Sequence, residues 1–283
     1  MLRAFTAAAA VVVIAATGAA FAAGETTPPL AHNFSFESPI GTYDMRAVQR
    51  GWQVYAQVCS NCHALEHLSY RNLGEEGGPF AKYMERDEAT GDLRPREVPG
   101  PPEHGGEFVE VTNNQWVRAI AAAATISDID PNTGQPADRP GRISDHIRRP
   151  FPNEAASRAS NGGAYPPDLS VITSARAGGA RYVRSILMGY TGETRGTLHG
   201  NRFFPGGMIA MPPPLADGAV AYTDGSPTTV EQYATDVATF LQWAADPHME
   251  VRKRTGIVVL AFLLALSALL FLAYKAVWRN ESH

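Results

Sequence analysis

Cys59-Ser60-Asn61-Cys62-His63 is the stretch on which the interpretation of this sequence of 283 residues depends. It has the pattern C-x-x-C-H, which is typical of covalent attachment of c-type haem. Two thiols three positions apart can each add to one vinyl group of a porphyrin, and His63 is then the proximal ligand of the iron. Cys59 and Cys62 are the only cysteines in the chain, so the motif predicts one covalently bound haem c.

Two other interpretations of this motif fit less well. A structural zinc site needs four ligands, usually with a second Cys or His pair at short spacing, and the sequence offers no such pair. A thioredoxin-like redox motif lies on a βαβ pattern, which is not visible around Cys59. The formal net charge of -4, without a basic bias, gives no indication of nucleic acid as a partner.

The N-terminus has the features of a secretory signal peptide. Arg3 precedes an apolar stretch, and Ala20-Phe21-Ala22 fits the small-residue cleavage pattern. The alternative is an uncleaved anchor, which the weakly hydrophobic, Ala-rich stretch disfavours. We expect residues 1–22 to be removed, although cleavage after Ala22 cannot be separated from cleavage after Ala23.

The residues before the motif form an amphipathic helix. Asp44 can cap a helix that begins at Met45. Its apolar face is expected to comprise residues at helical spacing, namely Val48, Trp52, Tyr55, Val58 and Cys62. Gly51 within it costs ~1 kcal/mol relative to Ala. It indicates either a close approach of another helix or a tolerated surface glycine.

A second amphipathic helix follows two overlapping capping boxes, Thr228 with Glu231 and Thr229 with Gln232. It is expected to end at Asp246-Pro247, and its aromatic residues could pack on Gly51.

Shorter helices are predicted over 113–124, with Trp116 on the apolar side, and over 169–175 and 180–188. Asp128–Gly134 resembles the start of a calcium-binding loop. An EF-hand loop needs Gly at its sixth position, but Thr133 stands there, so we interpret the stretch as a turn.

Residues 66–110 carry eleven acidic and five basic residues, interrupted by Pro and Gly. We expect them to be mostly irregular. Such a segment can be a docking surface for a basic partner, whose association it would accelerate. It can equally be a solvated loop face, because charge runs are commonly just exposed. The sequence leaves both interpretations open.

A haem that only transfers electrons needs a second axial ligand, and His/Met ligation raises its potential. Met188, Met208 and Met211 are candidates. Pro212–Pro214 would stiffen a loop after the last of these. Spacing alone does not choose between Met208 and Met211.

The C-terminal region predicts one membrane-spanning helix. The uncharged run from Gly256 to Tyr274 reaches about 28 Å at 1.5 Å per residue. Arg252, Lys253 and Arg254 precede it, which by the positive-inside rule would favour the opposite orientation, but large translocated domains escape that rule. We therefore expect a periplasmic haem domain over 23–253, an anchor over 254–277 and a cytoplasmic tail over 278–283.

The chain resembles the cytochrome c1 family. The resemblance is carried by residues 50–55 running into Cys59–His63, by Asn161 together with 165–170, by 204–213, and by 236–245 with the Arg-Lys-Arg before the anchor. It implies an all-α fold, with a cytochrome c-like haem domain, long loop insertions and one C-terminal transmembrane helix. It also selects Met211 as distal ligand, because the family's ligand stands directly before the proline run.

The resemblance further implies a set of pocket residues. Arg176 and Tyr182 are placed near a haem propionate, and Asn161 and Pro167 line the pocket. Some bacterial relatives hold the distal loop with a disulfide that this chain lacks, so packing of Phe203 and Phe204 is expected to replace it.

The function implied by the resemblance is electron transfer within the cytochrome bc1 complex of a bacterial inner membrane. The haem would take one electron from the Rieske iron–sulfur subunit and pass it to a soluble cytochrome c. Cytochrome b and membrane lipid would be further partners, and the enzyme activity would belong to the complex. A membrane-tethered c-type carrier outside such a complex is the alternative.

Overall fold

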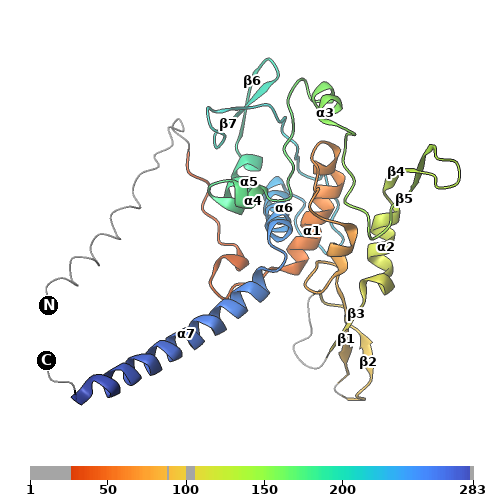
Figure 1. Ribbon diagram of the computed structural model, residues 1–283. Helices are drawn as coiled ribbons and strands as arrows, with labels where there is room; N and C mark the ends of the chain where they lie inside the picture. Colours follow the sequence, from red (N-terminus) through yellow and green to blue (C-terminus); the bar gives the residue numbers. More distant parts are fainter. Residues whose placement is uncertain (1–26, 88, 100–105, 281–283) are drawn as a thin grey trace.

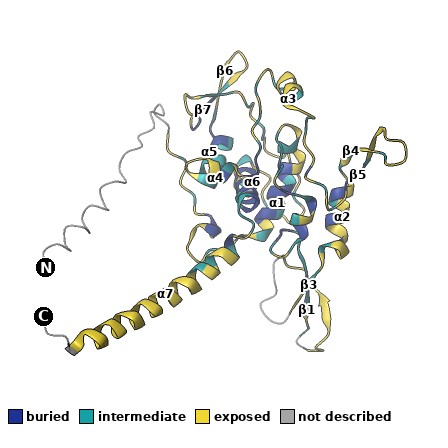
Figure 2. Cartoon of the chain, in the orientation of Figure 1, coloured by how far each residue is buried: buried dark blue, intermediate teal, exposed yellow. Residues whose placement is uncertain are grey.

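Two helices that pack against each other form the centre of the computed structural model, which describes residues 27–280 except 88 and 100–105. They are α1 (Met45–Gln57) and α6 (Val230–Ala245). Tyr43, just before α1, donates its hydroxyl to the carbonyls of Gln242 and Asp246 at the end of α6. Figure 2 shows that both helices are largely buried. The predicted signal peptide lies outside the described residues.

The predicted start of α1 and both predicted ends of α6 are confirmed, whereas α1 ends at Gln57 and does not continue into the motif as expected. Asp44 caps α1 by accepting hydrogen bonds from the N–H groups of Arg46 and Ala47. Thr229, the second of the two proposed caps, accepts from the N–H of Gln232, and Asp246 is the C-cap of α6. Local capping chemistry therefore determines where these helices begin.

Gly51 lies where the two helices approach most closely. A Cβ atom added there would be 2.1 Å from the backbone oxygen of Asp236 and 2.6 Å from Cβ of Phe240. Any side chain would push α1 and α6 apart, so the interpretation of Gly51 as a close-approach residue is confirmed. Trp52 and Tyr55 pack their rings on Phe240 beside this contact.

The hydrophobic core is built on this helix pair. Val48, Val54 and Tyr55 of α1 and Tyr233, Val237 and Phe240 of α6 are completely or almost completely buried. Val58 is only partly buried and Cys62 is exposed. The predicted apolar face therefore ends before the motif does.

Shorter helices complete the helical part of the fold. They are α2 (Gln115–Ala122), α3 (Glu154–Ser160), α4 (Ile172–Ala175) and α5 (Gly179–Met188), with 3-10 turns η1 (Ser35–Glu37), η2 (Cys59–Asn61), η3 (Tyr70–Gly74), η4 (Val111–Asn113) and η5 (Trp278–Asn280). The helix over 180–188 is confirmed. The helix predicted from Leu169 begins three residues later, because the Asp168 side chain accepts the N–H of Ser170 in a turn. Trp116 is 59% exposed beneath Lys82, so its predicted place on the apolar side is wrong.

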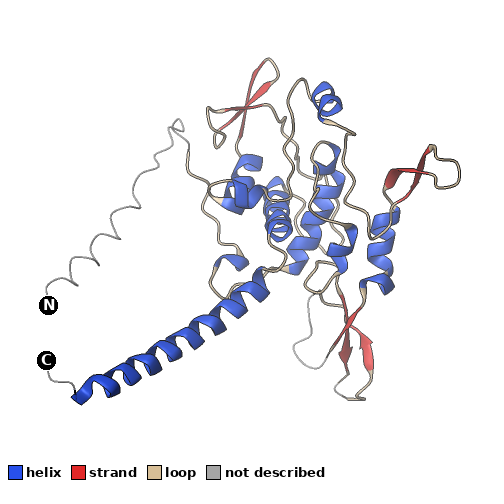
Figure 3. Cartoon of the chain, viewed as in Figure 1, coloured by secondary structure: helices blue, strands red, loops and turns tan. Residues whose placement is uncertain are grey.

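The expectation of an all-α fold needs correction. Three small antiparallel sheets lie outside the helical core (Figure 3). Their strands are β1 (Lys82–Arg86), β2 (Leu93–Pro95) and β3 (Glu107–Val109); β4 (Thr125–Ile129) and β5 (Pro136–Pro140); and β6 (Tyr190–Arg195), β7 (Leu198–Asn201) and β8 (Met208–Ile209). Most of these residues face solvent, so the alternating apolar pattern that predicts a strand is missing.

The turns of these hairpins explain why glycine stands at positions 91 and 134. Gly91 and Gly134 have positive φ angles of 76° and 67°, a conformation that favours glycine. The predicted turn at 128–134 is thus the connection between β4 and β5. Residues 66–110, expected to be mostly irregular, contain the β2-β1-β3 sheet.

The C-terminal helix α7 (Met249–Val277) leaves the domain at the end of α6 (Figure 1). It has 29 residues and is long and apolar enough to span a membrane, reaching about 43 Å at 1.5 Å per residue. Except for Met249 in its first turn, its apolar residues are exposed (Figure 2). The helix starts at Met249, so no break in secondary structure separates residue 253 from the predicted anchor.

Candidate haem site

The C-x-x-C-H motif follows directly on the core helix. α1 ends at Gln57, and η2 then turns the chain so that the N–H groups of Cys62 and His63 both donate to the carbonyl of Cys59, at 3.1 Å and 2.9 Å. Cys59 is partly buried, and Cys62 is exposed. Burial, reinforced by the neighbouring Cys62, raises the pKa of the Cys59 thiol to about 12. The hydrogen bonds to the Cys59 carbonyl place both sulfurs on one turn, as attachment to one porphyrin requires.

His63 has its ring fixed by a backbone carbonyl. Its Nδ1 lies 2.8 Å from the oxygen of Pro167. A carbonyl can only accept, so Nδ1 carries the proton and donates, and Nε2 keeps its lone pair. Burial lowers the pKa of His63, although the Pro167 carbonyl and Asp168 oppose the shift. The neutral imidazole with a free Nε2 is the form that can bind a metal.

The segment 167–170 is held against the residues that follow the motif. The N–H of Leu169 donates to the carbonyl of Ala64 at 2.9 Å. The Asp168 carboxylate accepts from the N–H of Glu66 at 2.9 Å, and Ser170 Oγ accepts from the N–H of His67 at 3.1 Å. These contacts place the Pro167 carbonyl on His63. Sequence reasoning missed the roles of Asp168 and Ser170, for which the only signal was the Pro-Pro-Asp turn pattern.

Of the four predicted pocket residues, Pro167 is the one whose contact with the motif is direct. Asn161 ends α3 and donates its amide to the carbonyl of Ser157 at 2.7 Å. Ser157 in turn shares with Cys62 the lining of a shallow cavity of about 70 Å³. α3 therefore lies beside the motif, whereas Asn161 is not among the residues that line this cavity.

Arg176 and Tyr182 lie near each other, at the end of α4 and on α5. Burial raises the pKa of Tyr182, and the positive charge of Arg176 opposes that shift. Arg176 is exposed and donates to the carbonyl of its neighbour Ala175. The structure thus brings these two together, and it gives neither a hydrogen bond to the motif.

Met211 is partly buried on a loop that Tyr190 of β6 holds. The Tyr190 hydroxyl lies 3.0 Å from the carbonyl of Met211 and 3.3 Å from that of Pro212. Phe203 is buried and packs so closely that a Cβ on Gly189 would lie 2.6 Å from its ring. Phe204 is only partly buried. Tyr190 and Phe203 therefore tie down the loop that has no disulfide.

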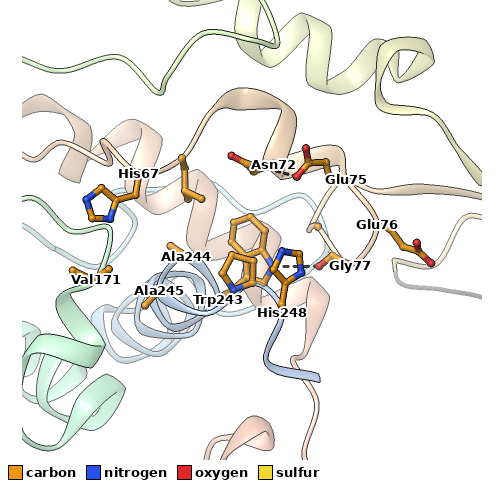
Figure 4. A pocket seen from close by; sticks show the side chains of 13 residues that line it. His67, Asn72, Glu75, Glu76, Gly77, Val171, Trp243, Ala244, Ala245 and His248 are labelled. Carbon is orange, nitrogen blue, oxygen red and sulfur yellow. Dashed lines mark hydrogen bonds between the residues drawn. The ribbon is translucent and has the colours of Figure 1, made fainter. Parts of the chain in front are cut away.

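A larger cavity, of about 270 Å³, lies between the loop after η3 and the end of α6. Figure 4 shows His67, Glu75, Glu76 and His248 around it, with the Trp243 indole bonded to the carbonyl of Gly77 at 3.2 Å. None of the residues that line it belongs to Cys59–His63. In the part of the chain that the structure describes, no three His, Cys, Asp or Glu side chains form a metal-binding group.

The acidic segment is partly neutralised by its own arginines. Glu85 pairs with Arg94 and Arg96, and Asp87 pairs with Arg94. These pairs cross between β1 and the segment around β2. Part of the negative charge of this segment is therefore matched within the hairpin itself.

The site defines the class of protein. Two thiols on one turn, a neutral imidazole with a free Nε2 and a tethered methionine loop fit a covalently bound haem, and the domain that carries them continues into a long apolar helix. This is a c-type cytochrome domain joined to a membrane-anchor helix. The profile of the Cytochrome C1 family matches residues 34–281, and the chain belongs to that family.

Three relatives support the same assignment. "Cytochrome c1" of Rhodospirillum rubrum is 34% identical over 89% of this chain and 88% of that protein. "Cytochrome c1-2, heme protein, mitochondrial" of Solanum tuberosum is 41% identical over 83% of this chain and 78% of that protein. "Cytochrome b/c1" of Bradyrhizobium diazoefficiens is 38% identical over 91% of this chain, which spans 36% of that longer protein. Members of this family carry covalently bound haem c and are electron-transfer subunits of the bc1 complex.

Proposed function

We propose that this chain relays single electrons within a cytochrome bc1 complex, from a Rieske iron–sulfur subunit to a soluble cytochrome c. The proposed haem is bound through thioethers to Cys59 and Cys62, with His63 and Met211 as axial ligands. The observation that carries the proposal is the hydrogen bond from His63 Nδ1 to the Pro167 carbonyl at 2.8 Å, because it leaves Nε2 free for the iron.

The chain's own residues prepare a fixed and closed site. The haem iron supplies the reversible one-electron change. Tyr55, buried in α1, donates its hydroxyl to the carbonyl of His63 at 3.1 Å, and Pro167 orients the imidazole ring. An acceptor on the ring N–H, such as the Pro167 carbonyl, holds a ligand's orientation and increases its basicity. Tyr55 fixes the backbone of His63 instead. The loop held by Tyr190 would supply the Met211 thioether as the second protein ligand of the haem, so that no coordination position would be left for a substrate.

The helix lengths favour a haem held above the membrane surface. α1 has 13 residues, and its first residue lies near the start of α7. At 1.5 Å per residue its far end, with the motif, is about 20 Å away. Figure 1 shows α3 and the β6–β7 hairpin at that same end of the domain. We propose a periplasmic domain over 23–253, an anchor over 254–277 in a bacterial inner membrane and a cytoplasmic tail over 278–283.

Membership of a complex is tested by purification of the full chain from its native membrane in mild detergent. We expect it to co-purify with a b-type cytochrome and a Rieske protein, identified by their reduced-minus-oxidised spectrum and their iron–sulfur EPR signal. Recovery of the haem-loaded chain alone, under conditions that preserve other membrane complexes, would favour a tethered carrier that acts outside a bc1 complex.

Covalent attachment is tested by replacement of Cys59 and Cys62 with serine. The double variant is expected to lose all haem-dependent peroxidase staining on a denaturing gel, because only thioether bonds survive denaturation. Each single variant should keep part of the stain, since one thioether remains. Ser60→Ala, which lies between the two thiols and leaves both in place, is the matched control and should stain fully. Full staining of the double variant would contradict attachment at this motif.

A further inference from the structure

The first turns of α7 are fastened to residues 34–43, which we call the strap. Lys253 Nζ donates to three backbone carbonyls of the strap, those of Phe36, Ser38 at 2.8 Å and Gly41 at 3.2 Å. An ammonium group has three donors, so these three acceptors satisfy it completely. Glu250, one turn earlier on α7, accepts the N–H of Tyr43 at 2.8 Å.

The strap that receives these contacts is itself well fixed. η1 winds it so tightly that a Cβ on Gly41 would lie 2.3 Å from the carbonyl oxygen of Ser35. The rings of Phe36 and Tyr43 are buried, with centroids 5.4 Å apart. The Tyr43 hydroxyl also bonds to carbonyls at the end of α6. The strap therefore holds both sides of the joint between α6 and α7.

The joint itself is short and would otherwise allow rotation. Only residues 246–248 separate α6 from α7. Met249 is buried and lies one turn before Lys253, so both face the domain. Arg252 and Arg254 are exposed, and Arg252 pairs with Asp246. Two of the three cations before the anchor are thus engaged within the chain.

We infer that Lys253 and Glu250 act as positioning residues that lock the haem domain and α7 into one rigid body; we call this pair of contacts the clasp. The chain itself then sets the tilt of its haem relative to the membrane, before any other subunit contacts it. A fixed tilt keeps the haem edge at the place where an electron donor must reach it. This inference rests on the proposed haem site for its function, whereas the clasp depends only on the contacts described.

The test uses the full-length, haem-loaded chain alone in oriented lipid multilayers. EPR of the ferric haem, recorded at different angles to the field, measures the spread of haem tilt. The wild type should show a strong dependence on angle. Lys253→Met, which keeps most of the length of the side chain but removes its donors, should lose most of that dependence. Arg254→Met is the matched control and should behave like the wild type. Glu250→Ala removes the second contact of the clasp. If Lys253→Met does not fold, a loss of angular dependence in Glu250→Ala supports the inference.

The outcomes distinguish loss of the clasp from the general effect of removing a cation beside the membrane. Three results would overturn the inference. The angular dependence could be unchanged in both clasp variants, it could be lost equally in Lys253→Met and Arg254→Met, or the wild type could show no angular dependence. Haem content is measured first, and a chain without haem would contradict the proposed function instead. In that case, the rate of amide hydrogen exchange in the strap tests whether the clasp exists. Faster exchange in Lys253→Met than in Arg254→Met supports it, and equal exchange overturns it.

Discussion

Replacement of Met211 by leucine is expected to abolish the low-spin, methionine-ligated spectrum of the haem and to lower its reduction potential. Leucine keeps the apolar volume of the side chain but has no sulfur to bind the iron. Thioether ligation favours ferrous iron, so its loss should lower the potential by on the order of 0.1–0.3 V, within the range of about 0.8 V that axial ligands span. Absorption spectra and a redox titration of the purified protein measure both effects.

Met208→Leu is the matched control for this experiment. Met208 lies three residues earlier, is also partly buried and pairs with Gly200 in the sheet of β6, β7 and β8. We expect it to leave the spectrum and the potential nearly unchanged. A changed spectrum in Met208→Leu together with an unchanged one in Met211→Leu would reverse the assignment of the distal ligand. Binding of carbon monoxide to the reduced Met211→Leu protein gives a second readout, since it requires an open iron position.

Replacement of Asp236 by alanine is expected to cause the largest loss of stability. Asp236 is completely buried on α6, and its two oxygens accept from Nε and Nη2 of Arg50 on α1, both at 2.9 Å. Tyr222 and Gln232 also donate to this carboxylate. Its removal leaves the guanidinium, whose side chain is only 15% exposed, with the partly exposed Asp224 as its remaining carboxylate. Loss of the buried partner costs up to about 3–5 kcal/mol. The thermal midpoint should fall by on the order of 10 °C.

Asp224→Ala gives the comparison. Asp224 pairs with the remaining nitrogen of Arg50 at 2.8 Å, but its side chain is 38% exposed. An exposed pair contributes about 0–1 kcal/mol, so this variant should melt close to the wild type. Thermal unfolding of both proteins, followed by circular dichroism, provides the measurement. Equal and small shifts in the two variants would show that the buried pair does not hold α1 to α6.

Several parts of the fold could be predicted because their signals are local. The cap at Asp44, the boxes around Thr229 and the apolar run of α7 each depend on residues a few positions apart. The hairpins could not be predicted in this way. Their strands are short and mostly exposed, and antiparallel pairing rather than an apolar face holds them, so neither helical nor alternating periodicity was present.

The candidate site was predictable in its chemistry but not in its supports. The motif at Cys59–His63 named the reactive groups, since the number and spacing of thiols and imidazole limit what they can bind. The partner of His63 could not be predicted in the same way, because Pro167 is 104 residues away along the chain and acts through a backbone carbonyl. No side-chain pattern indicates which carbonyl will face a ring.

By itself, the sequence of this protein determined its haem motif, its two core helices and its apolar C-terminal helix, because each depends on neighbouring residues. Only the tertiary structure decided the tautomer of His63, the buried pairing of Arg50 with Asp236 and the attachment of Lys253 to the strap. Arg50 and Asp236 are 186 residues apart, and Lys253 and Phe36 are 217 apart. Such contacts exist only after the helices have packed, since burial and direction, rather than residue type, select the partners.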